Sequence, residues 1–406
     1  MKFTKLSLIA ALAVTSAMAA ESTITGDAKL FYWTDDIGQH DLFNKNGALG
    51  DAAVSLDYSR DIMDGVTVNA GITGISTLGL ENTLVIGTNV NHGGTRTAVG
   101  TDDKVWIDTA NIVLKPIDKT MLIVGRQTLD TPLAFTETWN IAHNTFDAAV
   151  AVDNHIENTT LVAAWVGRGN GHNGFENVDG GQTKYGALNN GEEDALAANE
   201  GAFAVAAITK AIPNTTAQVW FYNVRNEADA VWLQADVDAT KEFTVGAQYS
   251  QISPKGIVDG KDDTKAFSGK VAYSANDLTL TGAYSEVDDK GLVYMGNTAT
   301  GGAHSGQSKL YTEAWWNYGF VGQAGAKTGM ISAALGDFTA QYTTVSNDNG
   351  KTLEMDEITL TATKKIGPVE ATVALINTSS DHVNDDGEKD LDGNTIQAYL
   401  TVPFSL

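Results

Sequence analysis

The sequence predicts an all-β transmembrane antiparallel barrel, and three observations support this fold class. Apolar and polar residues alternate with period two in segment after segment, which is typical of strands with one apolar and one polar face. No comparable stretch has the spacing of an amphipathic helix, and beyond the N-terminus none has the roughly 20 apolar residues of a helical membrane span. The connections alternate between short and long, as in barrels with short periplasmic turns and long extracellular loops.

The first predicted element is a cleaved signal peptide over residues 1–20. Lys2 and Lys5 form a basic start, an apolar stretch follows, and Ala17-Met18-Ala19 offers a small-residue cleavage site. A buried N-terminal helix is the alternative interpretation. We therefore expect an exported chain with a single barrel domain over residues 21–406.

The strands are predicted from their alternation. In the first strand Ile24, Ala28 and Leu30 share one face, while Asp27 and Lys29 share the other. The same pattern recurs in residues 52–58, 231–237, 243–250 and 278–285. A secreted β-sandwich alternates as well. Small hydroxylated residues on the polar faces and aromatic residues near the segment ends favour a barrel with a watery lumen.

The connections predict eighteen strands. Eight short turns and nine longer connections join them, and a barrel with both ends in the periplasm needs an even number of strands. A sixteen-stranded barrel is the alternative. Lys309–Asn317 also resembles a strand, but counting it would place two long loops in succession on opposite sides of the membrane. We assign it to an outer loop or to an upward extension of strand 14.

The last predicted strand runs to the end of the sequence. Ile396, Leu400 and Phe404 lie on one face, with Gln397 and Tyr399 on the other. Outer-membrane barrels usually end in such an alternating strand with an aromatic final residue. Here the final residue is leucine, and the aromatic residue lies two places earlier.

Composition excludes several classes of function. The chain has 26 lysines and arginines against 50 aspartates and glutamates, a formal charge of -24, so nucleic acid is not an expected partner. It has no cysteine, which excludes disulfides and thiolate metal sites. The sequence contains neither a Gly-x-Ser-x-Gly elbow nor a His-Glu-x-x-His pair, so we do not expect an enzyme.

The third long connection is the candidate pore constriction. Residues 130–146 are rich in apolar side chains, which a loop packed on the inner wall would bury. Arg126 precedes this loop and is expected to point inward, because an arginine on the lipid face near the midplane costs about 2–4 kcal/mol. Placed across from Asp130 and Glu137, it would create a transverse field. A structural ion pair that holds the loop is the alternative.

Charged residues on the polar faces are the candidate pore-lining residues. Positively and negatively charged side chains occur together on these faces, and a solvated face is the alternative interpretation. The predicted set is Lys29, Asp57, Asp147, Arg168 and Asp236. Asp108 does not fit the alternation of its strand, which indicates a β-bulge.

One acidic loop is a weak calcium candidate. Residues 386–393 resemble the start of a calcium-binding loop, with Glu388, Asp390 and Asp392 as oxygen ligands. The position of the closing glutamate is Tyr399, inside the last predicted strand, so a solvated acidic loop is the alternative. No other metal or cofactor is expected.

Two segments resemble a known family. The opening Met-Lys-Phe-Thr-Lys-Leu-Ser-Leu-Ile-Ala-Ala-Leu-Ala-Val resembles the signals of the major outer membrane porins of epsilonproteobacteria, the Campylobacter type. The stretch Thr120–Leu133 is similar to the Gly-Arg/Lys-Gln-x-Leu strand that those proteins share with the specific porins of pseudomonads, most sharply at Gly125-Arg126-Gln127. The resemblance implies an 18-stranded homotrimeric porin with a constricted, cation-preferring channel and a third outer loop folded into the lumen.

These observations combine into one expected function. We expect a porin of a Gram-negative outer membrane, surrounded by lipid and lipopolysaccharide, through which small hydrophilic solutes and cations diffuse passively. A substrate-selective porin is the nearer alternative. A structural or adhesive surface barrel without an open pore is the more distant one.

Overall fold

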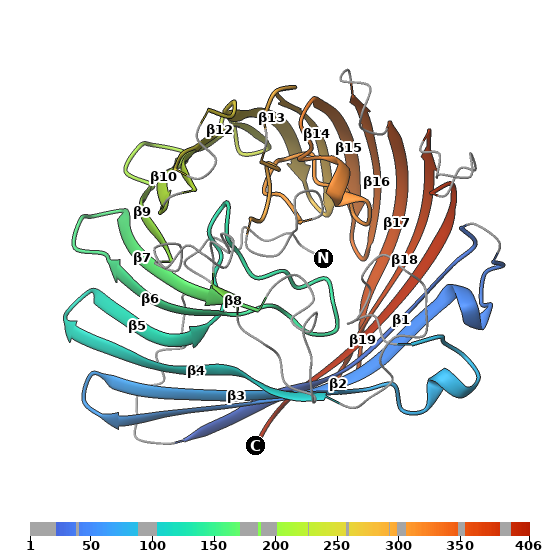
Figure 1. Cartoon of the computed structure of the whole chain (residues 1–406), viewed down its shortest axis with the longest axis horizontal. Helices are drawn as coiled ribbons and strands as arrows, with labels where there is room; N and C mark the ends of the chain where they lie inside the picture. The colour runs from blue at the N-terminus through green and yellow to red at the C-terminus, as the bar shows by residue number, and fades with distance from the viewer. Residues whose placement is uncertain are drawn as a thin grey trace.

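The protein is described by a computed structural model covering residues 22–37, 40–87, 104–170, 186–187, 201–225, 227–256, 260–291, 293–298, 306–347, 354–381 and 391–406. One antiparallel sheet dominates it, and Figure 1 shows its strands arranged around a central space. Within the described ranges, short 3-10 helices lie at Lys45–Gly47, Leu80–Asn82 and Tyr318–Phe320. Among the described residues no helix has the length and apolar character to cross a bilayer.

Alternation along the sequence produces the strands, because successive side chains of an extended chain point to opposite faces. Their bounds are β1 (Thr23–Asp35), β2 (Ala48–Met63), β3 (Val66–Ser76), β4 (Lys104–Ile117), β5 (Thr120–Gln127), β6 (Phe146–Asp153), β7 (Thr159–Gly169), β8 (Gly186–Ala187), β9 (Ala202–Thr209), β10 (Thr215–Val224), β11 (Ala228–Asp238), β12 (Phe243–Pro254), β13 (Thr264–Ala275), β14 (Leu278–Val287), β15 (Ala326–Leu335), β16 (Phe338–Asn347), β17 (Met355–Ile366), β18 (Val369–Ser380) and β19 (Gly393–Ser405).

The sheet closes on itself. From β1 to β7 and from β9 to β19 each strand pairs with the next, β7 pairs with β9, and β1 pairs with both β2 and β19. The two-residue β8 only extends the end of β7, so the remaining eighteen strands form the barrel. The predicted eighteen-stranded antiparallel barrel is confirmed, and the sixteen-stranded alternative is wrong.

The connections follow the predicted alternation. Short turns link β2 to β3, β4 to β5 and every second pair thereafter. The other end of the barrel carries nine connections, eight of them longer, but the one between β10 and β11 has only three residues (225–227). Left-handed residues such as Gly65 (φ 70°) and Asn214 (φ 56°) allow the chain to reverse tightly at the short-turn end. Residues 309–317 form no strand and belong to the loop between β14 and β15, so they do not extend strand 14.

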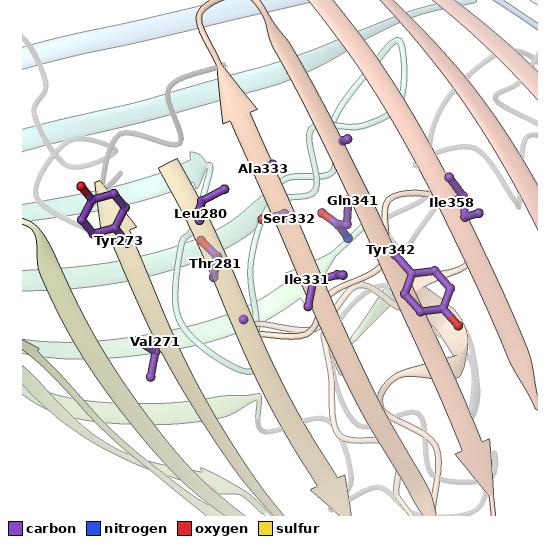
Figure 2. A pocket seen from close by; sticks show the side chains of 12 residues that line it. Val271, Tyr273, Leu280, Thr281, Ile331, Ser332, Ala333, Gln341, Tyr342 and Ile358 are labelled. Atoms are coloured by element: carbon purple, nitrogen blue, oxygen red, sulfur yellow. The ribbon is translucent and has the colours of Figure 1, made fainter. Parts of the chain in front are cut away.

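The two faces of the wall differ in chemistry. Large apolar side chains on the outer face are widely exposed, for example Val54 (50%), Val245 (45%) and Ile358 (49%). Across β13 to β17, outer residues such as Val271, Leu280 and Ile331 line an apolar groove of about 650 Å³ (Figure 2). Water would oppose so much exposed apolar surface, whereas the hydrocarbon core of a membrane matches it.

A β-bulge interrupts the wall at Asp108, as its sequence pattern indicates. Gly71 of β3 pairs with Thr109, and the next residue, Ile72, pairs with Ile107, so Asp108 is the extra residue. The bulge turns the Asp108 carboxylate into the lumen, where the side chain is 3% exposed. The position therefore belongs to the site described next.

Candidate functional site in the barrel lumen

Two long loops lie inside the ring of strands. We call residues 128–145, between β5 and β6, loop 3, and the described residues 288–291, 293–298 and 306–325, between β14 and β15, loop 7 (Figure 1). Leu133 of loop 3 and Leu310 of loop 7 are both buried in one apolar cluster with inward-facing wall residues such as Val150 and Trp220. Burial of these apolar side chains stabilises both loops against the wall.

Hydrogen bonds join the two loops directly. In loop 7 the Asn297 side-chain amide donates to the Phe135 carbonyl (2.8 Å) and to Glu137 Oε1 (3.0 Å). The backbone amide of Gln307 also donates to Glu137 Oε1, at 3.1 Å. Thr298 donates from its backbone amide to the Leu133 carbonyl at 2.9 Å. Loops 3 and 7 therefore form one unit within the lumen.

A buried carboxylate on β17 anchors loop 7 to the wall. Glu357, 1% exposed, accepts hydrogen bonds from the backbone amides of Trp315 (2.8 Å), Trp316 (3.2 Å) and Asn317 (2.7 Å). The Asn317 side chain donates to it as well, at 2.8 Å. With the Thr359 hydroxyl at 3.1 Å, five donors satisfy this buried carboxyl group, and the four from loop 7 fix the position of the loop.

An open cavity of about 360 Å³ remains between the loops and the wall of β9 to β13. Its lining is polar, with hydroxyl and amide groups between the charged residues. The lining residues are Asp130, Thr131, Pro132, Ile208, Lys210, Thr216, Gln218, Gln234, Asp236, Thr244, Gln248, Lys270, Lys309 and Tyr311. The cavity is thus bounded by loop 3, loop 7 and the inner wall of the barrel.

The charges of this cavity are mostly paired. Lys309 Nζ lies 2.7 Å from Asp130 Oδ1, and Lys270 Nζ lies 2.7 Å from Asp236 Oδ1. The Tyr311 hydroxyl donates to Asp236 Oδ1 at 2.9 Å. Lys210 adds a third positive charge to the lining. With three lysines and two aspartates, this side of the lumen carries a small positive excess, and we call it the lysine wall.

Strands β1 to β4 lie across the barrel from β9 to β13 (Figure 1), and their inward charges include three aspartates. Asp27, Asp57 and Asp108 face inward there and interact electrostatically, with Lys29 the opposing charge (Asp27 Oδ2 to Lys29 Nζ, 3.4 Å). A Cβ atom on Gly71 would overlap carboxylate oxygens of both Asp57 and Asp108, so these two groups approach each other over the glycine. We call this side, with three aspartates (Asp27, Asp57 and Asp108) and the opposing charge of Lys29, the acidic wall.

Part of the acidic wall is buried. The Thr73 hydroxyl donates to Asp108 Oδ2, and the Ser55 and Thr73 hydroxyls are 2.9 Å apart. Oδ1 of Asp108 and Oδ1 of Asp27 accept no hydrogen bond within the described part of the chain. Both oxygens are buried, so they add to the negative potential of this side of the lumen without being accessible to a permeating ion.

Two titratable groups of the loops depart from their ordinary behaviour. Burial lowers the pKa of His143 in loop 3 from 6.5, although the negative charge of Asp108 opposes that shift. Burial raises the pKa of Glu313 in loop 7 well above 4.5, against the opposing effect of hydrogen bonds from Ser308. Both side chains therefore favour their neutral forms.

Arg126, Asp147 and Arg168 do not line the lumen, which corrects their predicted placement. Arg126 pairs across β5 and β6 with Asp147, whose neighbours Phe146 and Ala148 are buried on the inner face. The three charged residues consequently lie on the outer face. Loop 3 covers this part of the inner wall, so inward residues such as Ile123 are apolar, like the residues on the outer face. The alternation of apolar and polar residues therefore did not identify the inward face here.

The predicted constriction of Arg126 against Asp130 and Glu137 is also corrected. Arg126 forms its ion pair with Asp147 (Nε to Oδ1, 2.9 Å), whereas Asp130 pairs with Lys309. Glu137 is 3% exposed and accepts from the Trp139 indole (2.9 Å) as well as from loop 7. Asp130 lines the cavity, but Glu137 holds the loops together.

Lys29, Asp57 and Asp236 lie on inward faces. Asp236 and its partner Lys270 line the cavity, whereas Lys29 and Asp57 belong to the acidic wall. Sequence reasoning missed the inward course of loop 7 and its anchor Glu357. The apolar run Leu310–Trp316 was the available signal, the same kind of signal that loop 3 provides.

The calcium interpretation stays a prediction. Glu388 and Asp390 lie outside the described residues. Asp392 accepts a hydrogen bond from the Ser380 backbone amide at 2.6 Å, so one of its oxygens supports the end of β18. Among the described residues no group of three potential metal ligands occurs.

Fold and lumen together define a class: the closed antiparallel β-barrel with an apolar outer face, a polar interior and infolded loops. Solved structures share this architecture. OccAB1 of Acinetobacter baumannii superposes with a TM-score of 0.72 at 13% identity, covering 95% of this chain and 97% of that one. OccD3 of Pseudomonas aeruginosa gives 0.68 at 13% identity, covering 96% and 92%. The outer membrane protein OpdK of P. aeruginosa gives 0.69 at 12%, covering 95% and 99%.

The likeness is one of fold. No protein-family model matches this sequence, and comparison with curated proteins finds no similar sequence. The eighteen strands, their order and nearly the whole length of the chain are nevertheless common to this protein and the outer-membrane barrels of two genera.

Proposed function

We propose that the protein is an outer-membrane porin through which small hydrophilic solutes and cations diffuse passively. The observation that carries this proposal is the contrast between the two faces of the barrel. Its outer face exposes large apolar side chains around the wall, while its interior holds hydroxyl, amide and charged groups around an open cavity. Such a wall is stable only where lipid surrounds it and water fills the interior.

The charge distribution supports a preference for cations. Asp27, Asp57 and Asp108 outnumber Lys29 on the acidic wall, and two of these carboxylates have oxygens without hydrogen bonds in the described part of the chain. Across the lumen, Lys270 and Lys309 are each neutralised by an aspartate. A cation therefore meets unbalanced charge mainly on the acidic wall, where a confined lumen limits screening.

Single-channel recording in planar bilayers tests the proposal. The mature chain should give steady, ohmic current, and a salt gradient should give a reversal potential of the sign that marks cation preference. A barrel that inserts but carries no current would contradict a porin, and would favour the structural or adhesive alternative with a lumen plugged by loops 3 and 7.

A second candidate function is a substrate-selective channel. It rests on the placement of the acidic wall and the lysine wall on opposite sides of the lumen (Figure 1). Such a field orients solutes that carry both charges. Zwitterionic amino acids added to the bath should then block the current with saturation, whereas neutral sugars of similar size should not. Absence of block by either class would leave simple diffusion.

Several finer expectations remain part of the proposal. From the sequence and its resemblance we further propose a Campylobacter-type relationship, a homotrimer, cleavage after residue 20 and a surrounding lipopolysaccharide leaflet. We also propose that the protein has no catalytic activity and that Glu388, Asp390 and Asp392 form a weak calcium site. Mass spectrometry of the mature chain tests the cleavage. Native gels of unheated protein from membranes test the trimer.

A further inference from the structure

Three charged residues cluster on the outer face where β5, β6 and β7 approach the end of the barrel that carries the long loops. Asp147 lies between two arginines: its Oδ1 is 2.9 Å from Arg126 Nε, and its Oδ2 is 2.7 Å from Arg168 Nη2. Arg126 and Arg168 are each one residue from the end of their strand. Two guanidinium groups and one carboxylate leave one positive charge in excess.

The two arginines differ in how their donors are used. Arg126 donates through Nε and Nη2 to Asp147 and through Nη1 to the Ile107 carbonyl (2.9 Å), and its side chain is only 22% exposed. Within the described part of the chain Arg168 makes one ion pair, through Nη2, and its side chain is 57% exposed. A guanidinium has five N–H donors, so most of those of Arg168 are directed to the surroundings.

The surroundings of Arg168 are those of a membrane boundary. Trp165 and Leu161 on the same face of β7 are exposed at 42% and 37% and continue the apolar outer surface toward the short-turn end. An indole ring beside a cation at the end of an apolar band is typical of the interface between hydrocarbon and headgroups. The arginine therefore lies at headgroup level, above a surface that fits acyl chains.

We propose that Arg168, positioned by Asp147 and Arg126, binds a phosphate group of lipid A in the outer leaflet. This inference rests on the proposed outer-membrane location, which places the long-loop end outside the cell. A planar guanidinium with free N–H groups matches phosphate oxygens in charge and geometry. The apolar surface below Trp165 would contact the acyl chains of the same molecule, which favours a lipid over a free anion.

Lipid binding to the purified mature chain in detergent tests this site. The probes are diphosphoryl lipid A and the same lipid with its phosphates removed, followed by native mass spectrometry. Arg168→Gln should weaken binding of diphosphoryl lipid A by about tenfold, as expected for one charge-assisted group, and should not alter binding of the dephosphorylated lipid. Arg60→Gln is the matched control, because Arg60 is an exposed arginine on the outer face of β2 at the short-turn end.

The outcomes are distinct. Equal binding by wild type and Arg168→Gln, or an equal loss in Arg168→Gln and Arg60→Gln, would overturn the site. Displacement of lipid A by millimolar inorganic phosphate would overturn the lipid as its ligand. Heat-modifiable mobility on gels checks that each variant is folded. Single-channel conductance, which Arg168→Gln should leave unchanged, reports on the porin function independently of lipid binding.

Discussion

The acidic wall and the lysine wall contain similar residue types in different arrangements. Around the cavity beside β9 to β13, Asp236 of β11 has Lys270 of β13 at 2.7 Å, and Asp130 of loop 3 has Lys309 of loop 7 at 2.7 Å. On the acidic wall, Asp57 and Asp108 approach each other over Gly71, and Lys29 lies 3.4 Å from Asp27. The count of charges along the chain is thus a poor guide to selectivity. What a permeating ion meets depends on which carboxylates already have a partner.

The largest expected effect is on the stability of the folded barrel. It tests which side chains point to the lipid and which point to the lumen, and the difference between the two walls depends on that assignment. Val245 and Thr244 are neighbours on β12, but Val245 is exposed on the outer face while Thr244 lines the cavity. Val245→Arg should destabilise the folded barrel by about 2–4 kcal/mol, because it places a charge in hydrocarbon. Thr244→Arg is the control and should assemble normally. Equal loss of heat-resistant folded protein in both variants would contradict the assigned faces.

The next effect concerns loop 7, which stands between the two walls. Glu357→Ala removes the acceptor of three backbone amides, and each buried donor left without a partner costs about 1–3 kcal/mol. The loop should leave the wall, and single-channel conductance should rise with greater current noise. Glu370→Ala, an acid near the short-turn end of the neighbouring strand β18, serves as the control. Unchanged conductance in Glu357→Ala would mean that loop 7 does not limit the pore.

Neutralising two carboxylates of the acidic wall tests directly whether this wall produces the cation preference of the channel. In Asp57→Asn combined with Asp108→Asn, the cation-to-anion permeability ratio should fall roughly twofold per charge, as expected for a unit charge about 8 Å from an ion in water. The reversal potential should shift at low and at molar salt, since confined charges are poorly screened. Asp118→Asn, in a short exposed turn, should have no effect at molar salt. A selectivity that survives the double substitution would place the filter elsewhere.

A smaller change of opposite sign is expected on the lysine wall. Lys210 lies at the start of a short turn and is the cavity lysine without an aspartate beside it in the described ion pairs. Lys210→Gln should raise the cation-to-anion permeability ratio by less than twofold, because bulk water at that end of the barrel screens the charge. Asp130→Asn should lower the ratio, since it leaves Lys309 unpaired. Reversal potentials in both variants measure these shifts.

The smallest expected effect is a dependence on pH. The folded protein keeps His143 neutral by burial, whereas an unfolded chain protonates this residue near pH 6.5. Acidification below that value therefore stabilises the unfolded state and weakens the packing of loop 3, while stability above it is unaffected by this group. Gating noise should increase between pH 7 and pH 5 in the wild type. His143→Asn should remove that increase, and an identical pH profile in this variant would exclude the histidine.

Much of the fold was predictable because its information is local. Period-two alternation needs only neighbouring residues, and so do the turn residues that mark the short connections. The inward packing of loop 3 was expected from Leu133, Phe135 and Ile141 for the same reason, and all three are buried. The β-bulge at Asp108 was expected because this residue interrupts the alternation of apolar and polar residues along its strand.

The partners of the charged residues were not predictable. Glu137 contacts Asn297 and Gln307, about 160–170 positions away, and no local pattern encodes such pairs. Arg126 was expected inside because an arginine at mid-membrane is costly. It lies one residue from the end of β5, where the cost of an outward arginine falls to about 0–1 kcal/mol. The distance of Arg126 from the membrane midplane therefore determines whether its side chain can point outward, and the sequence does not give that distance.

The seam between the first and last strands has a consequence for how the protein is made. Thr25 pairs with Ser405, and the backbone amide of Leu406 donates to the Ile24 carbonyl at 2.9 Å. Until the final residues arrive, β1 and β18 both present unpaired edges that other chains could pair with. The cylinder therefore cannot be completed progressively during synthesis. The chain must be kept apart from its copies until its last segment is available, and a truncation of only β19 should convert a stable protein into an aggregating one.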